Sequence, residues 1–141
     1  MTIQEIVLVS VLGAAACLTA LSPTASAGLD TSGSIICAIT DAFDCDSDEG
    51  CTLTKTENIG LPVFFKLDLP SREITAAGAR ETGDKRETAI KGVTDTDGKL
   101  FLQGVERRGW SLVVDKETGQ MTLAASSGDE AIVLFGRCTA P

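Results

Sequence analysis

Histidine and tyrosine are both absent from the sequence. Histidine is the side chain best suited to proton transfer near neutral pH, and neither a Ser-His-Asp nor a Cys-His arrangement can form without it. Without tyrosine, no phenol can act as an acid or a nucleophile. A pair of carboxylates could still act, as in glycosidases, but nothing selects one pair among the 20 acidic residues. We therefore expect a protein that is not an enzyme and that needs no cofactor.

Long apolar runs are missing too, apart from one near the N-terminus. The uncharged run at residues 6–21 is shorter than the roughly 20 residues that a membrane-spanning helix needs. The helix-breaking segment Ser22-Pro23-Thr24 follows it, and Ala25-Ser26-Ala27 supplies the small residues that signal peptidase requires. We interpret residues 1–27 as a signal helix that is removed before Gly28. This predicts a periplasmic or secreted protein that is not an integral membrane protein.

Two alternatives exist for the N-terminal segment. It could remain uncleaved as an anchor helix, although its length argues against this. It could also carry a lipid at Cys17, because Ala14-Ala15-Ala16-Cys17 loosely resembles a lipoprotein box. However, a leucine would normally stand three residues before that cysteine, and the chain stays apolar through Leu21. We therefore prefer a soluble exported domain to a lipid-anchored one.

Positive charge is scarce, since 20 acidic residues face 12 basic ones and the net charge is −8. Such a chain repels the phosphate backbone of nucleic acids and anionic lipid surfaces. We therefore expect no nucleic-acid partner. The chain that follows the signal is long enough for one domain with one hydrophobic core. We place a flexible lead at residues 28–34 and this domain at residues 35–141.

Four cysteines follow the signal, and an even number in a small exported chain indicates two disulfides. Four cysteines allow three connectivities. The loop between Cys45 and Cys51 is short and flexible enough to close on itself, which leaves Cys37 to join the first strand to the last at Cys138. We favour this pairing over a zinc site, since no cysteine pair has the spacing of a zinc knuckle and histidine is absent.

Alternation of apolar and polar residues predicts β-strands along most of the chain. It is clearest in a first strand from Ile35 to about Phe43. Further β-rich runs lie at residues 63–69, 88–94, 99–106, 110–115, 120–126 and 130–138. Beyond the signal, no segment shows a sustained helical period. Residues 72–87 are the hardest to assign, and we expect the start of a strand followed by a mobile loop.

Short turns join these runs. Asp97-Gly98 is the strongest hairpin signal, because a type I′ turn needs a positive φ that glycine accepts, and residues 115–119 fit a longer hairpin. Strands joined in this way form an antiparallel meander. We predict an all-β fold, a single small antiparallel up-and-down β-barrel, with a two-sheet β-sandwich as the alternative. Gly92, Gly104 and Gly136 would mark bends or bulges of the barrel strands.

One acidic cluster is a candidate metal site. Asp44, Asp46 and Asp48 occupy alternate positions, as in the first half of an EF-hand loop. Glu49 then stands where a glycine should turn the chain, and Lys55 occupies the position of the bidentate glutamate. These departures exclude an EF-hand. They leave a looser calcium site as a candidate, and a solvated acidic loop as the simpler interpretation.

Arg107, Arg108 and Trp110 form a candidate partner-binding site. Arginine and tryptophan dominate binding hot spots, and this tryptophan is the only one in the chain. The simpler interpretation buries Trp110 at the start of a core strand and leaves both arginines on a hairpin turn. The partner would be another envelope or secreted protein, or a small apolar ligand.

The segments LPVFFKLDL, KLFLQGVERRGWSLVVDKETGQMTL and IVLFGRC resemble a pattern of small exported proteins of Gram-negative bacteria that lack an assigned function. The resemblance covers most of the chain after the signal. It implies export and a β fold, and it carries no catalytic residue. The layout is also similar to that of small periplasmic lysozyme inhibitors, whose tyrosine-containing loop motif has no counterpart here.

Three functions are compatible with these features. We favour a non-enzymatic binding or protective module of the cell envelope, which would use the barrel surface or one mouth. The alternative is a small-molecule carrier with an apolar barrel cavity, for which Gly104, Ala124 and Ala125 would provide small inward side chains. A carboxylate-dependent hydrolase is the least favoured. A filled interior would argue against the carrier, and a groove with paired acids would argue for the hydrolase.

Overall fold

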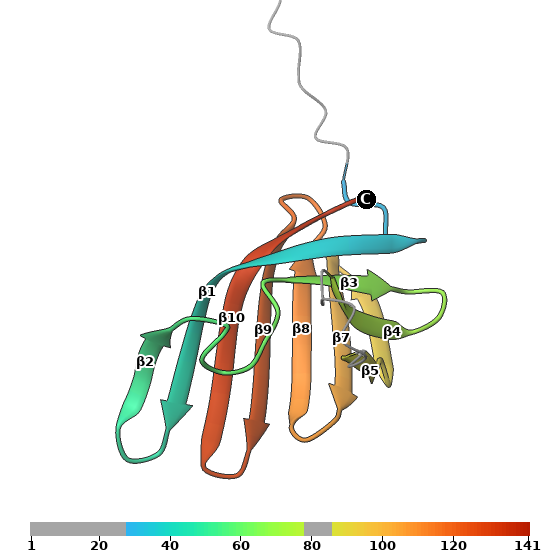
Figure 1. The fold of residues 1–141 in the computed structure, drawn as a ribbon. Coiled ribbons are helices and arrows are strands. Elements are labelled where there is room, and N and C mark those ends of the chain that lie inside the picture. The colour runs from blue at the N-terminus through green and yellow to red at the C-terminus, as the bar shows by residue number, and fades with distance from the viewer. Residues whose placement is uncertain (1–27, 78–85) are drawn as a thin grey trace, which may run out of the picture.

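The computed structural model describes residues 28–77 and 86–141, and all of the regular structure in these residues is β-strand. Figure 1 shows the ten strands, which are β1 (Ser34–Asp46), β2 (Gly50–Thr54), β3 (Phe64–Asp68), β4 (Glu73–Ala77), β5 (Glu87–Ala89), β6 (Gly92–Thr96), β7 (Lys99–Val105), β8 (Gly109–Asp115), β9 (Gln120–Ser127) and β10 (Glu130–Thr139). Within these two ranges there is no helix long and apolar enough to span a membrane.

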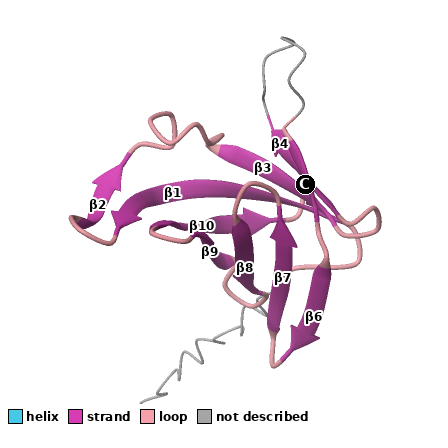
Figure 2. Ribbon diagram, turned by 90° about the horizontal axis from the view of Figure 1, so that it is seen from below, coloured by secondary structure: helices cyan, strands magenta, loops and turns pink. Residues whose placement is uncertain are grey.

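The ten strands form one antiparallel sheet that curls into a half-barrel (Figures 1 and 2). The order along the sheet is β5-β4-β3-β1-β10-β9-β8-β7-β6, and β2 pairs with β1 beside β3. Strands β3 to β5 form one meander and β6 to β10 another, and β1 joins them by pairing with both β3 and β10. The structure confirms the all-β antiparallel fold, and because one sheet contains every strand, it is not a two-sheet sandwich.

Strand β1 is long and bent, and crosses one end of the half-barrel (Figure 1). Its first part pairs with β3 and its last part with β2. Between Ile39 and Asp41 its register with β10 shifts by a β-bulge, which bends a strand. The loop at residues 55–63, between β2 and β3, returns to this bulge, and the Ile39 amide donates to the Val63 carbonyl oxygen at 2.8 Å.

The two edge strands of the sheet, β5 and β6, are consecutive in the chain, and only Ile90 and Lys91 separate them. The Ile90 amide donates to the carbonyl oxygen of Arg72, just before β4, at 2.9 Å. The Lys91 amide donates to the carbonyl oxygen of Gln103 on β7 at 2.8 Å. Through these two hydrogen bonds, Ile90 and Lys91 hold the edge strands β5 and β6 next to each other at one corner of the sheet. The expected single strand at residues 88–94 is therefore two short strands with different partners.

The hydrophobic core consists of alternate residues of each long strand, as the period of two predicts. The largest fully buried side chains are Ile35, Leu67, Leu100, Leu102, Leu112, Leu134 and Val114. Cys37 and Cys138 are opposite each other on β1 and β10 and form a disulfide within this core. This bond connects the first strand of the domain to the last.

A second disulfide joins Cys45 to Cys51 across the hairpin of β1 and β2. The sequence predicts a flexible loop here, whereas the structure contains β2. Nearly all residues of β2 are exposed, so it has no buried face and leaves no alternating apolar pattern in the sequence. Two disulfides in one small domain indicate an oxidising, extracytoplasmic compartment.

Other local expectations have mixed outcomes. Asp97 and Gly98 both have positive φ, at 50° and 73°, as the predicted type I′ turn requires. In the lead segment, the Leu29 amide donates to the Lys116 carbonyl oxygen at 2.6 Å, and the Leu29 side chain packs against the core. The predicted signal helix at residues 1–27 and most of the predicted mobile loop, residues 78–85, lie outside the described residues.

Candidate functional site

The concave face of the half-barrel contains a groove with a volume of about 760 Å³. Figure 2 shows the curl of the sheet that encloses it. The apolar part of its lining comes from six strands and from the loop at residues 55–63, and includes Ile39, Phe65, Ile74, Trp110, Leu123 and Ile132. Its volume and its mostly apolar lining are typical of small-molecule sites, which occupy roughly 300–1,000 Å³.

On β9, the inward side chains become smaller toward the groove. On β9, the inward positions are Met121, Leu123, Ala125 and Ser127 in turn. Met121 is buried in the core, whereas the next three residues line the groove. The small side chains of Ala125 and Ser127 therefore leave space on this part of β9. Ala124, which the sequence analysis places inside, is exposed and faces outward.

Trp110 forms one wall of the groove. It begins the buried face of β8 and is only 9% exposed. The ring lies over Gly104 on β7, where an added Cβ would overlap it and would lie 2.7 Å from the Ala89 carbonyl oxygen. The indole Nε1 donates a hydrogen bond to Thr88 Oγ1 on β5 at 3.3 Å. Trp110 therefore connects β8 to the edge strand β5, and its ring also lines the groove.

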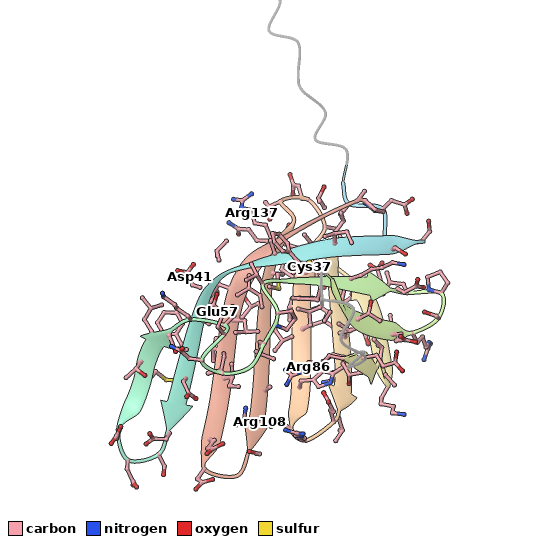
Figure 3. All side chains as sticks on the ribbon, viewed as in Figure 1. Cys37, Asp41, Glu57, Arg86, Arg108 and Arg137 are labelled. Carbon is pink, nitrogen blue, oxygen red and sulfur yellow. A yellow bond between two sulfur atoms is a disulfide. The ribbon has the colours of Figure 1, made fainter. Side chains whose placement is uncertain are left out.

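Three arginines line the groove together with these apolar side chains: Arg86, Arg107 and Arg108. Figure 3 shows Arg86 and Arg108 toward the end of the half-barrel opposite Cys37. The Arg86 guanidinium donates to the Gly60 carbonyl oxygen, which links β5 to the loop at residues 55–63. Arg108 forms an ion pair with Glu130, with 2.6 Å between Nη2 and Oε2. No carboxylate of the described residues forms an ion pair with Arg86 or Arg107.

Two carboxylates, those of Glu87 and Glu106, also line the groove. Glu87 begins β5, and Glu106 lies in the turn between β7 and β8. A carboxylate-dependent hydrolase would need a pair of this kind. The lining as a whole is apolar side chains with three guanidinium groups and two carboxylates, which is chemistry for holding a molecule by its apolar part.

The structure brings Arg107, Arg108 and Trp110 together at this groove, as the candidate partner-binding site requires them to be near one another. Trp110 is at the same time a buried residue, as the simpler interpretation has it. Arg86 and Leu61, from the loop at residues 55–63, also line the groove, although no sequence pattern predicted them there. The alternate residues of decreasing size on β9 are a sequence signal that could have indicated a hollow interior.

The acidic cluster does not assemble into a metal site. Asp46 Oδ1 accepts hydrogen bonds from the amides of Asp48 and Glu49, at 2.8 and 2.6 Å, and so stabilises the turn between β1 and β2. In the part of the chain that the structure describes, no three acidic or cysteine side chains are placed to hold a metal ion. Asp44, Asp46 and Glu49 instead line a smaller, polar hollow of about 320 Å³ beside this hairpin.

The acids with clearly shifted pKa values stabilise turns elsewhere. The Ser71 amide donates to Asp68 Oδ1 at 3.1 Å, and this hydrogen bond, helped by Lys66, lowers the pKa of Asp68 to about 2. The Thr118 amide and hydroxyl likewise donate to Asp115 and lower its pKa. Neither acid lines the groove, so these shifts concern stability and not chemistry at the site.

Comparison of the chain with protein-family models, with curated proteins and with solved structures finds no match.

Proposed function

We propose that the protein is an exported, non-catalytic binding protein, and that its groove holds an apolar molecule. It would act in the periplasm or outside the cell. The single observation behind this proposal is the apolar groove of about 760 Å³ on the concave face of the half-barrel. Of the functions compatible with the sequence, this is the small-molecule carrier.

The physical reason is the cost of leaving such a surface in water. Apolar surface removed from water contributes roughly 25 cal/mol per Å², so an apolar guest gains free energy by entering a preformed groove. Ile39 and Phe65 in the floor of the groove belong to the core, and the disulfide Cys37–Cys138 lies two residues from Ile39 in β1. This part of the groove is therefore continuous with the disulfide-linked core, which lowers the ordering cost on binding.

Export agrees with this function and with the two disulfides. Apolar molecules that cross or leave a membrane need a carrier in water, and a disulfide-stapled domain suits an oxidising compartment. The excess of acidic over basic residues helps to keep such a domain soluble while it exposes an apolar groove.

A hydrolase would use only the two glutamates of the groove, whereas a binding protein would use most of its lining residues. Glu87 and Glu106 are two of many lining residues, and most of the others are apolar. Under the binding proposal, the double change Glu87→Gln and Glu106→Gln preserves the affinity for a neutral apolar ligand, because the apolar contacts are untouched. Loss of a measurable hydrolytic activity in this variant would instead support the hydrolase.

The test uses a neutral long-chain alcohol, dodecanol, below its solubility limit. A ligand that binds only the folded state raises stability by mass action, by about 2.7 kcal/mol at a concentration ~100 times Kd. Dodecanol should raise the melting temperature of the wild type in a saturable way. Ala125→Phe should abolish this rise, because Ala125 is opposite Trp110 and Ile132 and a phenyl ring there fills the groove.

Ala124→Phe is the matched control, since it adds the same ring to the exposed face of the same strand. It should keep the response of the wild type to dodecanol. No response of the wild type, or an equal response of both variants, would contradict the proposed groove.

A further inference from the structure

We propose that the ligand of the groove is a free long-chain carboxylic acid, with its chain in the groove and its carboxylate held by Arg107 and Arg86. This inference rests on the proposed function and names the class of ligand. The alternatives are a neutral apolar molecule and a cationic amphiphile, and the charges that line the groove decide among these three.

Positive charge is concentrated at the groove. The chain has six arginines and a net charge of −8, yet three of these arginines line this one site. With Glu87 and Glu106 included, the lining residues still carry more positive than negative charge. Guanidinium groups that have no carboxylate partner attract an anion to that place, whereas the net negative charge of the protein repels it elsewhere.

The three arginines are not equivalent. Arg108 already has a carboxylate partner, Glu130, at 2.6 Å. Arg86 donates to the Gly60 carbonyl oxygen and keeps other N–H donors, since a guanidinium group has five. Arg107 is exposed and forms no ion pair within the described residues. Arg107 and Arg86 therefore have donors free for a ligand, and Arg108 has fewer.

A carboxylate is the anion that suits these donors and this shape. The planar guanidinium group matches a carboxylate with two parallel hydrogen bonds, and charged hydrogen bonds of this kind are stronger than neutral ones. The apolar lining, which includes Leu123 and Phe65, takes a chain. An apolar groove beside guanidinium groups thus fits a molecule with one apolar chain and one anionic end.

The experiment compares three single-chain ligands that differ only in the head group: dodecanoate, dodecanol and dodecylamine. Trp110 is the only tryptophan, tyrosine is absent, and the indole lines the groove, so intrinsic fluorescence reports directly on this site. Each ligand is titrated at neutral pH below its critical micelle concentration. Dodecanoate should bind about twofold to fivefold more tightly than dodecanol, as expected for one exposed charge pair, and dodecylamine should bind most weakly.

Three variants test which arginine causes the preference for the acid. Arg107→Gln should reduce the preference for dodecanoate over dodecanol, with Arg86 retaining the remainder, and should leave the affinity for dodecanol unchanged. Arg107→Lys should retain more of the preference than Arg107→Gln. Arg137→Gln removes the same charge from the outer face of β10, where Arg137 contacts the Thr118 carbonyl oxygen and not the groove. It should keep the full preference for the acid.

The outcomes separate this inference from the proposed function. Equal affinity for dodecanoate and dodecanol would overturn the carboxylate assignment and leave the apolar groove intact. Loss of the preference in Arg137→Gln as well as in Arg107→Gln would assign it to the overall charge and overturn the role of Arg107. Binding to phosphatidylglycerol vesicles alone, with no free ligand bound, would replace the free acid with a membrane surface. No binding of any ligand would overturn the proposed function itself.

Discussion

The indole Nε1 of Trp110 donates a hydrogen bond to Thr88 Oγ1, and so connects β8 to β5, one of the two edge strands of the curled sheet. The two residues belong to different halves of the sheet, which β1 and β10 join on the other side. Together with the corner at Ile90 and Lys91, this contact holds the edges of the sheet at a fixed separation. The width of the groove therefore depends on the position of one tryptophan ring.

Gly104→Ala tests this relationship. A Cβ at residue 104 would overlap the Trp110 ring, so the ring must move away from β7 and toward the groove. Overpacking of this kind costs about 1–3 kcal/mol. The variant should unfold at a lower denaturant concentration, and its tryptophan emission should shift to longer wavelength as the ring becomes more exposed.

Gly109→Ala is the matched control for this variant. Gly109 is next to Trp110 in the sequence, but an added Cβ there has open space around it. Its stability and its tryptophan emission should stay close to those of the wild type. If Gly104→Ala also behaves like the wild type, the ring does not lie against β7 as described.

The two disulfides should contribute unequally to stability. The bond Cys37–Cys138 joins residues 101 apart in the sequence, and Cys45–Cys51 joins residues 6 apart. Chain-entropy arguments give about 4–5 kcal/mol for the long loop and about 2 kcal/mol for the short one. Urea unfolding of Cys37→Ala/Cys138→Ala and of Cys45→Ala/Cys51→Ala should show the larger loss for the first pair. Equal losses would contradict the role of the long-range bond.

Asp68 should give the protein a stability that depends on pH. Its pKa of about 2 in the folded state is below the ordinary value of 3.8, so its stabilising effect is present above the ordinary pKa and disappears as the pH falls through about 2. Asp68→Asn should therefore lower the melting temperature at neutral pH. The difference from the wild type should shrink below pH ~4 and vanish near pH 2.

Lys66→Gln serves as the control for Asp68. The Ser71 amide is the largest cause of the shift and Lys66 a smaller one, so this variant should keep most of the pH dependence. A difference between Asp68→Asn and the wild type that is the same at every pH would show that the carboxylate has no such effect.

Strands with one buried face were the easiest to predict from the sequence. On β8, Trp110, Leu112 and Val114 point to the core and alternate with less buried residues, so the period of two is visible. Strand β2 has no buried face and no such period. The corner at Ile90 and Lys91 was also invisible, because it depends on hydrogen bonds to Arg72 and Gln103, which are distant in the sequence.

Only the local part of the site could be predicted in the same way. Arg107, Arg108 and Trp110 are within four residues of each other, so their chemistry is conspicuous in the sequence. Arg86 and Leu61 join them only because the loop at residues 55–63 returns to the bulge in β1 and β5 is held at the sheet edge. Such placement depends on long-range pairing, which no local pattern encodes.

The measurement that tests the central claim most directly is quenching of Trp110 by a long-chain alcohol that carries bromine at mid-chain. Bromine quenches tryptophan only at close contact, and Trp110 is the only tryptophan in the chain and lines the groove. We expect saturable quenching at one ligand per protein, lost in Ala125→Phe and retained in Ala124→Phe. Unquenched emission while the alcohol still binds would place the chain elsewhere and contradict the groove as the binding site.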